Sequence, residues 1–310
     1  MNMPEEPEQV HMPHDKGYRH LFASKKVFLQ LIRSFIKHGW AEQIDEANLE
    51  YINRTFVLQD FKDKEADVVY RAKLKDRDVI FYVLMELQST VDFLIPQRLL
   101  LYMNEIWRTI LKNMPQGEAE RKDFRMPAIV PIVLYNGKAT WTVPLNFKET
   151  LNSYDIFGEH LVDFRYILIP VQSYSEAELL ELSNLIALIF RLDRVDDLEE
   201  ILETLVKYFS VINKLTPEEF NLFMAWAIQV LPGSFPEENK NEIIRVLKEA
   251  HPKEVETLIS NVERAVKKSL DDAEKKGIEK VAKQMIAEGE DVEKIIRYTG
   301  LAREEIEKLG

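Results

Sequence analysis

The chain has 310 residues, 46% of them hydrophobic and 30% charged, a composition that supports a packed core and excludes wholesale disorder. It has no cysteine, which excludes a disulfide scaffold, a thiolate zinc site and a cysteine nucleophile. The net charge is -12, but residues 14–125 hold 19 basic and 17 acidic side chains, so the acid is concentrated in the second half. Charge therefore permits a DNA partner for the first half without favouring one.

The apolar runs are too short to cross a bilayer, which takes about 20 residues. The longest are AIVPIVLY from Ala128 and LIALIF from Leu185. The opening MNMPEEPEQV carries three Glu and no apolar stretch, so it lacks the form of a signal peptide. We therefore expect a cytoplasmic protein with no membrane partner.

Apolar residues at helical spacing predict a helix over about residues 23–37, ended near Gly39, and a second helical patch over about 42–51. The pattern then changes to stretches rich in Val, Ile, Phe and Tyr. These predict strands of an antiparallel meander at residues 54–59, 66–74 and 79–88.

Helical spacing returns over residues 93–112, where the helix is expected to start after Pro96. Residues 128–135 are almost continuously apolar and end at Asn136-Gly137, which predicts a strand buried on both faces. Residues 164–171 predict another strand.

Beyond Ser173 the pattern is helical. Three segments have the form of a capped helix start, namely Ser175 to Glu178, Asp197 to Glu200 and Thr216 to Glu219. The charged tail from about Glu254 is expected to be broken at Gly277, Gly289 and Gly300. The whole order predicts an α+β fold with a helical C-terminal half.

Polar residues at the edges of apolar strands are the candidates for chemistry. Glu86 and Gln88 end the strand VIFYVLMELQ and project from one face, because positions two apart on a strand do so. Asp67 opens the preceding strand, and a hairpin would make it a cross-strand neighbour of Glu86. Taken singly, Asp67 also fits a turn residue and Glu86 with Gln88 a solvated strand end.

Two carboxylates at the edge of a core repel each other and are costly to desolvate. A divalent cation relieves both costs, and oxygen ligands favour Mg²⁺ or Mn²⁺. Such an ion can hold a water, lower the pKa of that water and polarise a phosphodiester.

An Asp at one strand start followed by Glu-x-(Lys/Gln) on the next resembles the PD-(D/E)XK nuclease superfamily. More narrowly, the chain resembles the Rpn recombination-promoting nucleases, also known as YhgA-like transposases. The matching text is HDKGYRHLF, EADVVYRAKL, VLMELQSTVDFLIPQRLLLYMNEIW, PIVLYNGKATW and, in the tail, AKQMIAEGEDVEKIIRYTGLAREEIEKL. The resemblance implies a restriction-endonuclease-like core with a mixed central sheet flanked by helices, followed by an all-helical C-terminal region.

Carried over to this sequence, the resemblance implies that Asp67 and Glu86 are metal-binding catalytic residues. Gln88 stands where many members of the superfamily have Lys, and an amide can orient water or bind a phosphate oxygen but supplies no positive charge. Asp15, in the opening motif, is a candidate for a further metal ligand. Arg98 and Tyr102, one helical turn apart, are candidates for nucleic-acid contact or for bracing Glu86.

We accordingly expect an acidic leader at residues 1–13, a PD-(D/E)XK nuclease-like domain at 14–172, a helical region at 173–253 and a charged helical tail at 254–310. The leading hypothesis is a Mg²⁺-dependent DNA endonuclease connected with recombination. The second keeps the nuclease-like fold as a catalytically weak or inactive module that binds DNA or protein. A third is an acidic helical protein that forms homo-oligomers through its C-terminal region.

Overall fold

A computed structural model describes residues 13–52, 68–74 and 80–310, except for the side chains of residues 13–15, 80 and 81. The chain forms two compact units. The first comprises residues 1–195 and 208–230, and the second comprises residues 196–207 and 231–310. No helix in the described part of the chain combines the length and the apolar character that a bilayer crossing requires.

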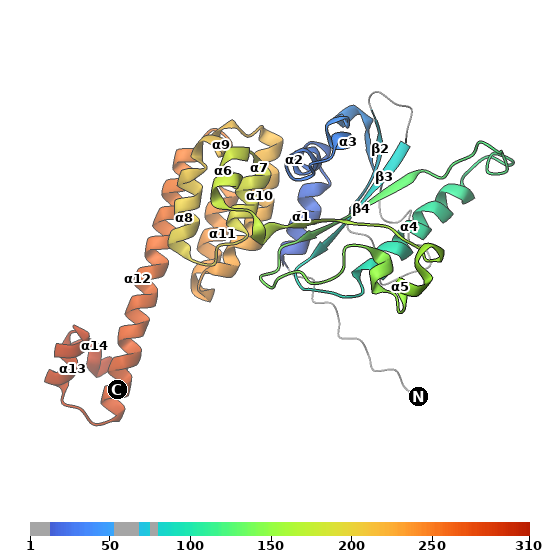
Figure 1. Cartoon of the computed structure of the whole chain (residues 1–310). Coiled ribbons are helices and arrows are strands. Elements are labelled where there is room, and N and C mark those ends of the chain that lie inside the picture. The colour runs from blue at the N-terminus through green and yellow to red at the C-terminus, as the bar shows by residue number, and fades with distance from the viewer. Residues whose placement is uncertain (1–12, 53–67, 75–79) are drawn as a thin grey trace. The chain divides into compact units, whose positions relative to one another are not determined.

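The first unit is built on a mixed sheet that has five strands within the described residues, in the order β1-β2-β3-β4-β5. Neighbouring strands are antiparallel from β1 to β3 and parallel from β3 to β5 (Figure 1). Their bounds are Leu49–Tyr51, Val68–Lys73, Ile80–Gln88, Ala128–Tyr135 and Ile167–Pro170. The predicted α+β class and the antiparallel pairing of the strands at 66–74 and 79–88 are thus confirmed.

Helices cover both faces of this sheet (Figure 1). Tyr70 of β2 faces α1 (Pro13–Phe22) and α2 (Lys25–Phe35): its hydroxyl donates to the Phe22 carbonyl at 2.8 Å, and its ring stacks on Phe28. Val69 points the opposite way, as alternation requires, into the core under α4 (Ile95–Lys112). The sheet is therefore the middle layer of the unit.

The core under α4 is built from its sheet-facing side and the strands beneath. Its buried members are Val69, Leu84, Ile95, Leu99, Tyr102, Met103, Ile106, Ile129, Val133 and Tyr166. Pro96 lies in the first turn of the helix, where its missing N–H costs nothing. The helix begins one residue before this proline, close to the predicted position.

Helix α1 is tied to α10 (Pro217–Val230) by a close approach at Gly17. A Cβ on Gly17 would lie 2.8 Å from Cδ1 of Trp226, whose side chain is fully buried. A glycine is needed here to let the two helices meet. Residues 208–230 therefore pack as part of the sheet-containing unit, although residues 196–207, which directly precede them in the chain, belong to the second unit.

The remaining elements of the first unit are short helices. In chain order they are α3 (Gly39–Glu42), η1 (Glu46–Asn48), η3 (Phe147–Thr150), α5 (Tyr154–Phe157), η4 (Gly158–His160), η5 (Val171–Ser173), α6 (Glu176–Leu182), α7 (Leu185–Leu192) and α9 (Phe209–Lys214).

The second unit is helical. It contains α8 (Leu198–Lys207), η6 (Leu231–Ser234), η7 (Glu237–Asn239), α11 (Lys240–Lys248), α12 (Val255–Ala287), α13 (Val292–Thr299) and α14 (Arg303–Leu309). The end of α12 packs with the last two helices around Ala282, Ile295 and Ile306. Apolar side chains of the tail are thus buried in a small core of its own.

Three expectations need correction. The opening motif forms a separate helix, α1, where the sequence predicted only one helix over about 23–37. The patch at 42–51 is not one helix, because Leu49–Tyr51 pairs with β2. Gly277 does not break the tail: α12 runs through it, held one residue earlier by the ion pair of Lys276 with Glu238.

The strand predicted at 54–59 lies outside the described residues.

Two other features of the helical region agree with the sequence. The capping box of Ser175 and Glu178 is present, and Gly289 and Gly300 have positive φ angles of 77° and 71° after their helices.

Candidate functional site

Glu86 lies near the carboxyl end of β3, the middle strand of the sheet, and is only 4% exposed. It shares a face with Leu84, a member of the core under α4, because the two residues are two positions apart on the strand. On β4 its register partner is Val133, from the same core. A carboxylate is thus held among apolar neighbours at one end of the sheet, where the cost of desolvating it is high.

Gln88 follows on the same face and ends β3. Its side-chain Nε2 donates to the Leu87 carbonyl at 2.8 Å. The Asn136-Gly137 turn closes over this end of the strand, since the Asn136 N–H donates to the Gln88 carbonyl at 3.0 Å. A Cβ on Gly137 would lie 2.4 Å from the Ser89 carbonyl oxygen, so the turn needs glycine.

Asp67 lies outside the described residues, as does the side chain of Asp15, whose backbone belongs to α1. The register of the neighbouring residues is defined: Val68 is opposite Met85 and Val69 is opposite Leu84. The predicted juxtaposition of the start of one strand with the end of the next is therefore present as far as Val68 and Met85.

Arg98 lies in the second turn of α4, with its side chain 15% exposed. Its Nη1 atom is 3.1 Å from Oδ2 of Asp92, in the loop between β3 and α4. Oδ1 of the same Asp92 accepts from the Leu94 N–H at 2.8 Å. Tyr102, one turn beyond Arg98, is 5% exposed and belongs to the core under α4.

The donor chemistry of the predicted set fits a hard cation. Glu86 offers carboxylate oxygens, the ligands that Mg²⁺ and Mn²⁺ prefer. Within the described side chains, no group of three or more His, Cys, Asp or Glu could hold a metal ion. A group of three carboxylates at Glu86 would have to draw on side chains outside the described ones, such as those of Asp67 and Asp15.

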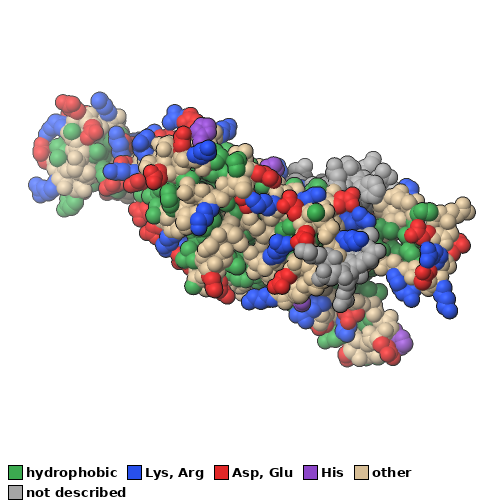
Figure 2. Space-filling model, turned by 90° about the horizontal axis from the view of Figure 1, so that it is seen from above, with side chains coloured by type: hydrophobic (Ala, Val, Ile, Leu, Met, Phe, Trp, Pro, Cys, Tyr) green, Lys and Arg blue, Asp and Glu red, His purple; other side chains and the backbone are tan. Residues whose placement is uncertain are grey.

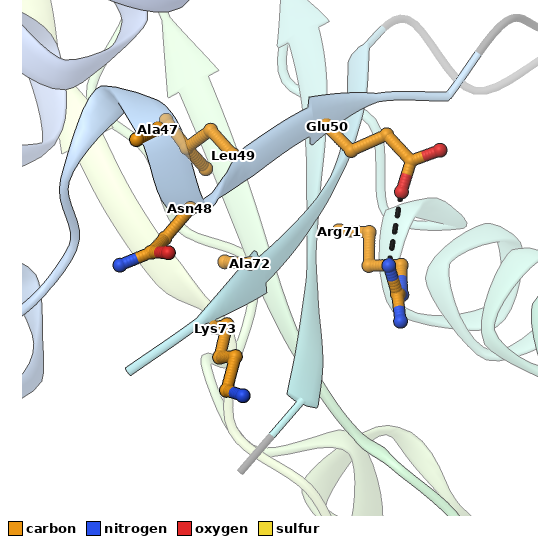
Figure 3. A pocket seen from close by; sticks show the side chains of 7 residues that line it. All are labelled: Ala47, Asn48, Leu49, Glu50, Arg71, Ala72 and Lys73. Atoms are coloured by element: carbon orange, nitrogen blue, oxygen red, sulfur yellow. Dashed lines mark hydrogen bonds and ion pairs between the residues drawn. The ribbon is translucent and has the colours of Figure 1, made fainter. Parts of the chain in front are cut away.

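A cavity of about 210 Å³ lies along β1 and β2, and Glu86 is not among the residues that line it (Figure 3). In it Arg71 Nη1 lies 3.0 Å from Oε2 of Glu50, and Arg71 is the register partner of Tyr82, four residues before Glu86. Burial raises the pKa of the Tyr82 hydroxyl, and the positive charge of Arg71 opposes that rise. The opposite charges of Arg71 and Glu50 compensate each other, so this cavity does not suggest catalysis.

On the face of the molecule drawn in Figure 2, the charged side chains give no strong signal for nucleic acid. On the face in Figure 2, Lys and Arg side chains are interspersed with Asp and Glu. A DNA-binding surface normally has a clear basic excess. This face therefore offers no basic patch for a phosphate backbone.

Two residues of the site region were missed in the sequence. Asp92 fixes Arg98 and the start of α4, and Gly17 lets α1 pack on α10. An Asp three residues before a helix start is a usable signal for the first, since such a side chain commonly accepts from a backbone N–H two residues further on. The second depends on a tertiary contact with Trp226, which local sequence does not contain.

Comparison with known families gives one clear result. The family described as "Putative transposase, YhgA-like" matches residues 12–219, about two thirds of the chain. Searches of curated proteins and of solved structures found no match. The match spans the sheet, Glu86, Arg98 and the start of α10. The chain belongs to the YhgA-like transposase family, the group that its sequence motifs resemble.

Proposed function

We propose that this protein is a Mg²⁺-dependent DNA endonuclease with a PD-(D/E)XK-type core. Membership of a transposase-like family supports DNA as the substrate. The mixed sheet, with two antiparallel pairings followed by two parallel ones and helices on both faces, is compatible with that core. Under this proposal Mn²⁺ is expected to support cleavage in place of Mg²⁺, because both ions bind oxygen ligands.

The observation that carries the proposal is Glu86 itself: a buried carboxylate on the central strand, with Gln88 two residues beyond it. The register of Val68 with Met85 supports the second ligand, since one further step of the same ladder would bring Asp67 opposite Glu86. We propose that Glu86 and Asp67 hold the ion, with Asp15 as a further oxygen donor.

Each side chain has a task in this proposal. When bound, Mg²⁺ supplies positive charge against the negative charge that develops on the phosphate. Gln88 orients the attacking water or a phosphate oxygen through its amide, without adding charge. Arg98 donates to a phosphate oxygen, and Tyr102 packs beneath it in the core and fixes the helix that carries it.

The test is supercoiled plasmid DNA incubated with purified protein in Mg²⁺, in EDTA and with the Asp67→Ala variant. Nicking or cutting is expected for the unmodified protein and for the control in Mg²⁺, and is expected to be lost in EDTA and in Asp67→Ala. Asp123→Ala is the matched control, because Asp123 is an exposed carboxylate paired with Arg121. Cleavage that persists in EDTA or in Asp67→Ala would overturn the proposal.

One observation favours a second function, a nuclease-like module that binds DNA or protein with little or no catalysis. The Gln88 amide is engaged with the adjacent Leu87 carbonyl and cannot contribute the charge that a lysine would. Under this alternative DNA binding would persist in EDTA and be unaffected by Asp67→Ala, and no cleavage would appear in Mg²⁺. The third hypothesis, homo-oligomers formed through the C-terminal helices, is independent of this alternative and is tested by sedimentation.

A further inference from the structure

The two edges of the Arg98 guanidinium group have different hydrogen-bonding surroundings. Its Nη1 atom is fixed by Oδ2 of Asp92 at 3.1 Å. Its Nε and Nη2 atoms, which form the other edge of the guanidinium, are buried and have no hydrogen-bond partner within the described residues. Buried donors without partners are costly, and native structures contain few of them.

Other arginines of the same unit use this edge. Arg108, ten residues further along α4, directs Nε and Nη2 to Oε2 of Glu105 at 2.8 and 2.7 Å. Arg121 directs the same two atoms to the two carboxylate oxygens of Asp123. In these two cases a carboxylate occupies the edge that, in Arg98, faces no hydrogen-bonding group of the described chain.

The Nε and Nη2 edge has the geometry that matches two oxygens of a carboxylate or phosphate. Asp92 restricts how Arg98 can turn, because it also accepts the Leu94 N–H at 2.8 Å and so is fixed to the backbone of the turn. Both residues lie in the segment that directly follows Glu86 and Gln88 in the chain.

We infer that Asp92 is a positioning residue that orients Arg98 so that its Nε and Nη2 edge binds two oxygens of one DNA phosphate. The inference rests on the proposed function, because it assigns this phosphate to the DNA bound at Glu86. Asp92 itself contacts no DNA in this account and acts only through Arg98.

The experiment measures binding of a fluorescent DNA duplex by anisotropy in EDTA, so that no cleavage interferes. Arg98→Lys keeps the charge but loses the two-donor edge, and binding is expected to weaken roughly 10-fold. Asp92→Asn is expected to weaken it roughly 3- to 5-fold, since the ion pair with Arg98 is lost. General electrostatics predicts the opposite sign, because removing a negative charge near DNA strengthens binding.

The double variant separates positioning from a merely structural role. If Asp92 acts through Arg98, the double variant binds about as weakly as Arg98→Lys alone, since changes in one linked unit do not add. Arg108→Lys is the control on the same helix and is expected to bind like the unmodified protein. Urea unfolding of each variant shows whether the fold is retained.

Unchanged or tighter binding by Asp92→Asn in a stably folded variant would overturn the inference, as would unchanged binding by Arg98→Lys. The latter is the result expected if an ordered water satisfies the edge. Additive losses would also overturn it. If binding follows the expectations but no Mg²⁺-dependent cleavage is found, the nuclease proposal fails and the phosphate contact stands. If the protein cleaves DNA but neither the Arg98 nor the Asp92 substitution changes binding, the nuclease proposal stands and the phosphate contact fails.

Discussion

Buried glutamates occur in two regions of the sheet-containing unit, and their surroundings differ. Glu219, in the first turn of α10, accepts from the Thr216 N–H and hydroxyl at 2.9 and 2.6 Å. From α2, Lys26 and Gln30 also approach its carboxylate, at 2.9 and 2.6 Å. Glu86 lies instead on a central strand, opposite Val133 and two residues from Leu84.

The difference shows that burial alone does not mark a catalytic carboxylate. The surroundings of Glu219 account for its burial, since it completes a capping box and links two helices. Burial by itself would raise the pKa of Glu219, but hydrogen bonds from Thr216 and Lys26 outweigh it and hold the pKa below the ordinary value. Glu86 has no capping task, because it lies within a strand at the end of the sheet.

We expect the largest effect from Glu86→Gln, which should lower Mg²⁺-dependent DNA cleavage at least about 100-fold. An amide of the same shape removes the charge that holds the ion. The free energy of unfolding in EDTA should stay the same or rise, because a neutral amide is cheaper to bury than a carboxylate. Plasmid cleavage and urea unfolding measure the two quantities, with exposed Glu50→Gln as the control.

Glu219→Gln should show the opposite pattern, with cleavage retained and the free energy of unfolding lowered by about 2 kcal/mol at neutral pH. The charged hydrogen bonds to Thr216 and Lys26 are weakened in this variant. If Glu219→Gln instead lost most of its cleavage activity without losing stability, the two glutamates could not be separated into a catalytic and a structural residue.

The effect of Glu219→Gln should also depend on pH. Because the pKa of Glu219 is lowered in the folded state, its stabilising contribution is present above the ordinary carboxyl pKa. It is lost as the pH falls through the lowered folded value. Urea unfolding of both proteins from pH 7 downwards should therefore show the stability difference shrinking; a difference that grows in acid would contradict the assignment.

A smaller effect tests the support of α1 by α10. Gly17→Ala should lower the free energy of unfolding by about 1–3 kcal/mol, because its Cβ would meet Trp226 at 2.8 Å. Gly277→Ala is the matched change inside α12, where nothing lies within 4 Å, and should raise stability by about 0.5–1 kcal/mol. If the two substitutions changed the free energy of unfolding equally, helix propensity and not the contact with Trp226 would determine the effect at Gly17.

The strands were predictable because their side-chain alternation is local. The change to stretches rich in Val, Ile, Phe and Tyr sufficed to predict that 66–74 pairs with 79–88, and the register agrees where the structure describes it. Helix α1 was missed because its centre holds a glycine, a poor helix former, and the contact with Trp226 that favours glycine is 209 positions away in the chain. The sequence predicted a break at Gly277, but a single glycine costs a helix interior only about 1 kcal/mol, and α12 runs through it.

In the candidate site, Glu86 and Gln88 could be predicted from the sequence, because they are polar residues at the end of an apolar strand. Arg98 was nominated from the family resemblance and from its helical spacing with Tyr102. The role of Asp92 could not be predicted, because it arises from how a side chain folds back on the turn before α4. Whether Asp67 completes the site stays a prediction of the register.

The most direct test of the central claim is calorimetric titration of Mg²⁺ into the unmodified protein and into Glu86→Gln. The account predicts saturable binding by the unmodified protein and binding at least about 10-fold weaker in the variant. Identical titrations of the two proteins, or no Mg²⁺ binding by either, would contradict it.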